Sequence, residues 1–118
     1  LADNGSHDSA IRAIEHFLKQ YTATHPELAQ EALLLEGQCY VHQGKLDKAN
    51  DAFIAFLGTY PHARKAPNAR FFVGYCYMLQ GAFDKARENL TMLIADYPQC
   101  IYSTRAKTCL SRIESLAE

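Results

Sequence analysis

The 118-residue sequence has no tryptophan, only 4 prolines and 6 glycines, and almost no net charge. A formal net charge of −1 gives no electrostatic reason to expect a nucleic-acid partner or an anionic membrane surface. No apolar run approaches the roughly 18 residues that a membrane span requires. We therefore expect no nucleic-acid binding and no direct membrane span.

Patterns that carry catalysis or bind cofactors are missing as well. The glycines stand singly instead of forming a phosphate-binding loop, and there is no serine nucleophile motif. The 5 histidines are scattered, and although Cys39 and His42 lie one turn apart, no further ligands are placed to join them. The sequence predicts no catalytic residue, no cofactor and no metal site, and we interpret the chain as a protein that is not an enzyme.

Four cysteines are present, and their spacing leaves the cellular compartment open. Cys39 and Cys76 occupy equivalent places in two repeated segments, so we expect both to be small buried core residues. A disulfide between Cys100 and Cys109 remains an alternative to free thiols.

The most informative feature is an internal repeat with an offset of 37 residues. The segment from Ala69 to Pro98 reproduces many residues of the segment before it. The residues that recur are Ala32, Gly37, Cys39, Tyr40, Gln43, Gly44, Asp47, Lys48, Ala49, Tyr60 and Pro61, matched by Ala69, Gly74, Cys76, Tyr77, Gln80, Gly81, Asp84, Lys85, Ala86, Tyr97 and Pro98. A period of 20–50 residues indicates a repeat architecture in which each unit buries its apolar face against its neighbours.

Apolar residues recur with a period of about 3.6 within each segment, which predicts helices and no strands. Gly44 and Gly81 are expected to end the first helix of each repeat in a left-handed conformation. Asp47 and Asp84 are expected to cap the helices that follow. Glycines at mid-helix positions 37 and 74 indicate close approach of a neighbouring helix, because each would otherwise cost about 1 kcal/mol relative to alanine.

The repeated pattern resembles the tetratricopeptide repeat, a helix–turn–helix unit of about 34 residues. Its positions fall on Leu33, Gly37, Tyr40, Ala49, Phe53 and Pro61, and again on Gly74, Tyr77, Ala86, Leu90 and Pro98. Neither repeat has the family's tryptophan, and Arg70 stands in place of Leu33. The resemblance implies an all-α, right-handed α-solenoid of about six antiparallel helices.

We expect a single domain over residues 1–118. It would consist of a partial repeat at 1–26 that contributes only a second helix, full repeats at 27–63 and 64–100, and a capping helix at 101–118. Gly5, Asp8 and Ala10 match Gly44, Asp47 and Ala49 at an offset of 39. Residues 1–5 are therefore expected to be the tail of a preceding helix, with a turn near Gly5 and the next helix over 8–22.

In the family that the chain resembles, ligands lie on the concave face formed by the first helices. Carried onto this sequence, the partner-binding positions are Leu34, Gln38, Val41, Phe71, Tyr75, Met78 and Arg112. Most are apolar, so they form either a groove for a protein or peptide partner or a surface covered within the chain itself. A carboxylate clamp of the chaperone type is not expected, because its lysine and asparagine positions hold Leu34, Gln38, Phe71 and Tyr75.

The dipeptides Tyr60-Pro61 and Tyr97-Pro98, followed by a short loop, resemble a bacterial subgroup of these repeats. That subgroup includes the Tol–Pal-associated periplasmic protein and the lipoprotein of outer-membrane assembly. The resemblance implies a non-catalytic interaction scaffold in the periplasm or cell envelope. A cytoplasmic adaptor domain and a self-associating homo-oligomer are the alternatives.

Overall fold

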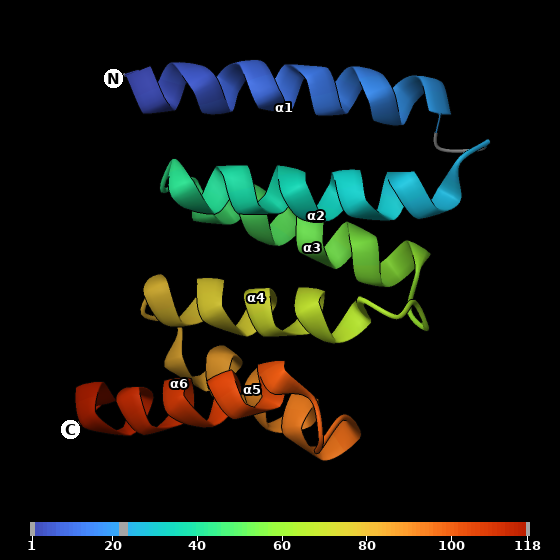
Figure 1. Cartoon of the computed structure of the whole chain (residues 1–118). Coiled ribbons are helices and arrows are strands. Elements are labelled where there is room, and N and C mark those ends of the chain that lie inside the picture. The colour runs from blue at the N-terminus through green and yellow to red at the C-terminus, as the bar shows by residue number, and fades with distance from the viewer. Residues whose placement is uncertain (1, 22–23, 118) are drawn as a thin grey trace. The chain divides into compact units, whose positions relative to one another are not determined.

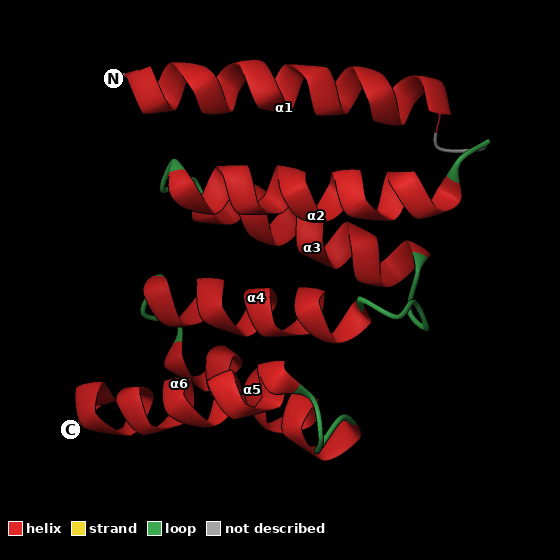
Figure 2. Cartoon of the chain, viewed as in Figure 1, coloured by secondary structure: helices red, strands yellow, loops and turns green. Residues whose placement is uncertain are grey.

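The computed structural model describes residues 2–21 and 24–117, which form six α-helices (Figure 1). Their bounds are α1 Ala2–Tyr21, α2 Pro26–His42, α3 Leu46–Thr59, α4 Ala66–Leu79, α5 Phe83–Asp96 and α6 Ile101–Ala117. The described part of the chain contains helices and connecting loops but no strand, as Figure 2 shows. The predicted all-α repeat fold is confirmed.

The helices belong to two compact units, each with its own internal packing. The first unit, residues 1–60, contains α1, α2 and α3, with α2 packed against both α1 and α3. The second unit, residues 61–118, contains α4, α5 and α6, and each of these helices packs against the other two.

Glycine ends α2 and α4 as the sequence predicts. Gly44 and Gly81 have φ angles of 76° and 80°, the only positive φ angles in the described chain. Such a conformation suits glycine, which has no Cβ to clash with the preceding turn. Each glycine thereby reverses the chain between two antiparallel helices.

The prediction that Asp47 and Asp84 cap the next helices is wrong. The cap positions are Lys45 before α3 and Ala82 before α5, and neither side chain makes a capping hydrogen bond. The two aspartates instead lie in the first turn, where a negative charge interacts favourably with the helix dipole.

Close contact at a mid-helix glycine fixes the pairing of α2 with α3 and of α4 with α5. A Cβ built on Gly37 would lie 2.5 Å from the Phe53 ring, and one built on Gly74 would lie 2.6 Å from Leu90. The same helix pairs place a lysine ammonium near a tyrosine ring at equivalent positions, Lys48 over Tyr40 and Lys85 over Tyr77. The sequence repeat is thus also a repeat of contacts.

Helix α1 departs from the prediction at its start. It begins at Ala2 and continues through Gly5, so the expected turn near Gly5 is wrong. Polar contacts hold this end of α1 against the α2–α3 turn, because Asp8 accepts a hydrogen bond of 2.6 Å from Gln43 and lies 3.9 Å from the Lys45 ammonium. A helical glycine costs only about 1 kcal/mol, so the matching residue types at an offset of 39 do not by themselves make a turn.

The four cysteines are all free, and the alternative disulfide between Cys100 and Cys109 does not form. Cys39 and Cys76 are buried, which confirms their prediction as core residues. Burial raises the pKa of the Cys76 thiol to about 11, as expected when desolvation disfavours the thiolate.

Candidate functional site

Two residues predicted to face a partner, Phe71 and Met78, are buried instead, with exposed fractions of 6% and 5%. They belong to a core cluster with residues of α5 and α6, and the Phe71 ring centroid lies 5.4 Å from that of Tyr102. Their expected exposure is therefore wrong, and the alternative in which the surface is covered within the chain holds for them. The physical cause is α6, which packs directly against α4.

The other predicted partner-binding residues differ in exposure. Leu34 is buried as well, with an exposed fraction of 6%, so its expected exposure is also wrong. Gln38 and Val41 are half-buried on α2, and Arg112 is exposed on α6. Tyr75 is half-buried and stacks on Phe71 at 5.8 Å between ring centroids. A binding role for the partly or fully exposed side chains stays a prediction; these are Gln38, Val41, Tyr75 and Arg112.

An apolar groove of about 300 Å³ lies between α1 and α2 in the first unit. Its lining residues are Ala13, Ile14 and Phe17 from α1 and Leu28, Glu31, Ala32 and Leu35 from α2. We call this surface the α1–α2 groove. It offers a hydrophobic ligand apolar side chains along its whole length, with one carboxylate among them.

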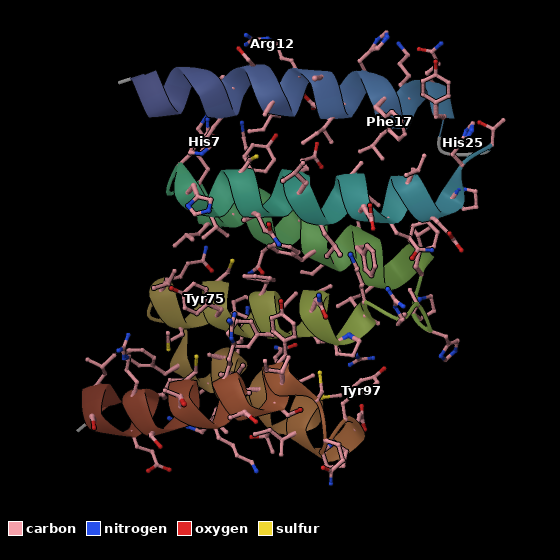
Figure 3. All side chains as sticks on the ribbon, viewed as in Figure 1. His7, Arg12, Phe17, His25, Tyr75 and Tyr97 are labelled. Atoms are coloured by element: carbon pink, nitrogen blue, oxygen red, sulfur yellow. The ribbon has the colours of Figure 1, made fainter. Side chains whose placement is uncertain are left out.

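The walls of the groove come from regularly spaced positions on two helices. Leu28, Ala32 and Leu35 follow one another at i, i+4 and i+7, the spacing that places side chains on one face of a helix. Phe17 lies on the side of α1 that faces α2 (Figure 3). Leu28 and Leu35 are each 49% exposed, which is high for leucine. The groove therefore combines the buried Ile14 with two accessible leucines.

A second depression in the first unit, of about 320 Å³, is more polar. Glu15, Glu36 and Asp51 are among its lining residues. Burial, and secondly the negative charge of Glu15, raise the pKa of the Glu36 carboxyl above its ordinary value. The lysine that also lines it, Lys48, places a positive charge beside these carboxylates.

The side chains described, those of residues 7–21 and 24–116, include no group of three histidine, cysteine or acidic side chains arranged to hold a metal ion. Within the same ranges, no helix combines the length and apolar character needed to cross a bilayer.

The α1–α2 groove was not predicted, because the binding positions of α2 were expected at Leu34, Gln38 and Val41. Leu28 and Leu35 belong to a neighbouring stripe of the same helix. The i, i+4, i+7 spacing of Leu28, Ala32 and Leu35 was a usable signal, but it indicates an apolar face without telling whether another helix covers it.

Comparison with protein families identifies the repeat. A family model described as tetratricopeptide repeat matches residues 1–64 and 43–99, which together span most of the chain. No curated protein shows significant similarity to this chain. The matched ranges contain the five helices α1 to α5, including both glycine-centred helix pairs. The chain therefore belongs to the tetratricopeptide repeat family, whose members are typically non-catalytic and generally mediate protein–protein interaction.

Proposed function

We propose that this chain is a non-catalytic scaffold that holds an apolar segment of a partner protein in the α1–α2 groove. The observation that carries the proposal is the pair of exposed leucines, Leu28 and Leu35, along a groove of otherwise apolar lining. Accessible apolar surface of this kind is typical of interaction sites, since leaving it in water is unfavourable. The general role of tetratricopeptide repeats in protein–protein interaction supports the same reading.

A groove variant with a matched control tests this function. Leu35→Glu places a charge inside the groove, whereas Ile54→Glu changes an equally exposed aliphatic residue, 47% exposed, on α3. Burying a leucine side chain is worth about 1.5–3 kcal/mol, so Leu35→Glu should weaken partner binding at least tenfold. Ile54→Glu should bind as the unaltered protein does.

The measurement is affinity capture of the native partner, followed by titration of that partner against the three proteins. Circular dichroism melting curves first establish that both variants fold as the unaltered protein does. Retention of the partner by all three proteins with equal affinity would exclude the groove as the binding site.

We further propose the periplasm or cell envelope as the place where the scaffold works. The support is the resemblance at Tyr60-Pro61 and Tyr97-Pro98 to the envelope-associated subgroup. A cytoplasmic adaptor is the second candidate, favoured by the four cysteines, none of which forms a disulfide. Fractionation of cells that express the natural full-length protein separates the two, because recovery in the cytosolic fraction alone would contradict the envelope proposal.

A further inference from the structure

We propose that the exposed side of α6 binds an acidic, amphipathic helix of a partner protein. The surface consists of Ile101, Arg105, Thr108, Arg112 and Leu116, and we call it the α6 face. Two carboxylates of the partner helix would pair with the arginines, and two apolar residues would cover the ends of the face. The α6 face shares no residue with the α1–α2 groove, so this inference goes beyond the proposed function.

The α6 face is one continuous side of a helix. Its five residues are all exposed, and their spacing of four, three, four and four positions places them on the same side. The face is about 22 Å long, at 1.5 Å per residue. A partner helix that lies along α6 has the same rise per residue, so side chains with the same spacing can meet the whole face.

Apolar side chains form both ends of the face. Ile101 is 68% exposed and Leu116 is 59% exposed, the highest values for large apolar residues among the described side chains. Leaving such side chains in water is unfavourable, and burying them against a partner would stabilise a complex.

The middle of the face is positively charged. Among the described residues, neither Arg105 nor Arg112 forms an ion pair with a carboxylate. Glu114, the one acidic residue of α6, follows Lys107 by seven positions and therefore lies with it on another side of the helix. The sequence of α4, which packs against α6, contains no acidic residue. Residues 61–118 have eight arginines and lysines but five aspartates and glutamates, so the face attracts an acidic segment.

Aromatic packing holds one of the two arginines in place. The guanidinium carbon of Arg105 lies 5.3 Å from the centroid of the Tyr102 ring. That ring contacts Phe71 and Phe72 of α4, at centroid distances of 5.4 and 6.2 Å. A guanidinium group held over a packed ring loses less conformational freedom when it binds a carboxylate. It can also donate two parallel hydrogen bonds to that carboxylate.

The α6 face is not required by the packing that the repeats share. At a core position, α4 and α6 both have a completely buried alanine, Ala69 and Ala106. One residue earlier, at the surface, α4 has Asn68 and α6 has Arg105. The arginine therefore serves no common packing role, which leaves its charge available for recognition.

Charge favours a partner protein over a helix of the same chain. No charged side chain is buried among the described residues, and the buried polar ones are Asn50 and Ser103. A helix of this chain that covered the α6 face permanently would remove two guanidinium groups from water, which is unfavourable unless both are paired in good geometry. Arginine is instead enriched in interfaces between separate proteins.

The test uses a fluorescein-labelled helical peptide of the length of α6. Leucine, glutamate, glutamate and leucine repeat the spacing of Ile101, Arg105, Arg112 and Leu116, and the other positions are alanine and glutamine. This spacing reads the same in both directions, so the peptide can bind parallel or antiparallel to α6. We call it the glutamate peptide.

Fluorescence anisotropy measures its binding to the unaltered protein, to Arg112→Glu and to the matched control Lys107→Glu. The control makes the same charge change on another side of α6, and circular dichroism melting curves establish that both variants fold. We expect the unaltered protein and Lys107→Glu to bind the glutamate peptide alike. Arg112→Glu should bind it at least fivefold more weakly, because a repulsion replaces an attraction.

A charge exchange makes the test sharper. A second peptide has lysine in place of both glutamates, and a double variant combines Arg105→Glu with Arg112→Glu. The lysine peptide should bind the double variant more tightly than it binds the unaltered protein. The opposite order would overturn the pairing with these two arginines.

Three outcomes would overturn the proposal without affecting the α1–α2 groove, whose test changes Leu35. The first is a glutamate peptide that does not bind the unaltered protein. The second is equal weakening by Arg112→Glu and Lys107→Glu, which would mean that general positive charge attracts the peptide. The third is a single-stranded oligonucleotide that binds as tightly as the glutamate peptide, which would exclude specificity for a protein segment.

Two further results would reassign the occupant of the face and overturn the partner helix. A dimer that is lost in Arg112→Glu and kept in Lys107→Glu, measured by sedimentation, would identify a second copy. In the natural full-length protein with Cys100→Ser, a Thr108→Cys side chain that stays unreactive toward a maleimide would assign the covering helix to the same polypeptide. The expected result is a reactive thiol that becomes protected when the glutamate peptide is added.

Discussion

Replacing Gly37 by alanine should destabilise the first unit, although alanine is the better helix former. A Cβ at this position would lie 2.5, 2.6 and 2.8 Å from three atoms of the Phe53 ring. Phe53 is completely buried, and a closely packed interior leaves its ring little room to move away. The substitution therefore sets a gain in helix propensity against a steric overlap.

The two effects can be compared in magnitude. Alanine in place of a helical glycine gains about 1 kcal/mol. Overpacking a well-filled core costs about 1–3 kcal/mol, and three ring atoms within 3 Å of the new methyl group place Gly37→Ala at the upper end of that range. The expected net loss is about 1–2 kcal/mol, which lowers the melting temperature by roughly 4–8 °C in a protein of this size.

Urea and thermal unfolding followed by circular dichroism measure this loss. Gly58→Ala on α3 is the matched control, because a Cβ there would meet no atom within 4 Å. It should leave stability unchanged or raise it by up to about 1 kcal/mol. If Gly37→Ala proved as stable as the unaltered protein, α2 and α3 could not be packed through Gly37 and Phe53, and the explanation of the mid-helix glycine would fail.

Two further predictions follow from perturbed ionisation. Glu36→Gln should raise stability at neutral pH, because the raised pKa of Glu36 beside Glu15 makes its ionised form unfavourable in the folded state. As pH falls, the folded state takes up a proton on Glu36 before the unfolded state does. The extra stability of Glu36→Gln should therefore disappear as pH approaches the ordinary pKa of 4.5. A difference between the urea midpoints of Glu36→Gln and the unaltered protein that is the same at all pH values would contradict this. With a thiol pKa of about 11, Cys76 is only about one-thousandth thiolate at pH 8. Mass spectrometry should show iodoacetamide modifying the half-buried Cys100 first and Cys76 only on unfolding, and similar rates at both would refute the difference in accessibility.

Helix order and turns were predictable from the sequence because they depend on local chemistry. Gly44 and Gly81 adopt the left-handed conformation that ends a helix, and that preference belongs to glycine itself. The mid-helix glycines likewise indicated close helix contacts, and the structure shows Phe53 and Leu90 against them. Aspartate was less informative, since it is favourable both at a cap and in the first turn. The start of each second helix was therefore placed two residues late, at Asp47 instead of Lys45 and at Asp84 instead of Ala82.

The binding surface could not be predicted in the same way, because exposure depends on which helix packs where. Phe71 and Leu35 are both apolar residues on the first helix of a repeat, and periodicity assigns both to apolar faces. Phe71 is covered because α6 packs on α4, whereas Leu35 lies in a groove lined by α1 and α2. Tertiary packing decided between them, and neither residue type nor spacing carries that information.

The contact between Gly37 and Phe53 also fixes the axial register of α2 and α3. Sliding one helix along the other by a turn, about 5.4 Å, would bring the ring against Leu33 or Val41, which carry branched side chains in place of the glycine hydrogen. Packed helices usually accommodate small shear displacements through adjustments of side chains. The Phe53 ring lies directly against the backbone of Gly37, which has no side chain that could adjust to such a displacement. The α2–α3 pair should therefore move as one rigid body, so that a displacement of one end of the pair displaces the other end without sliding of α2 along α3.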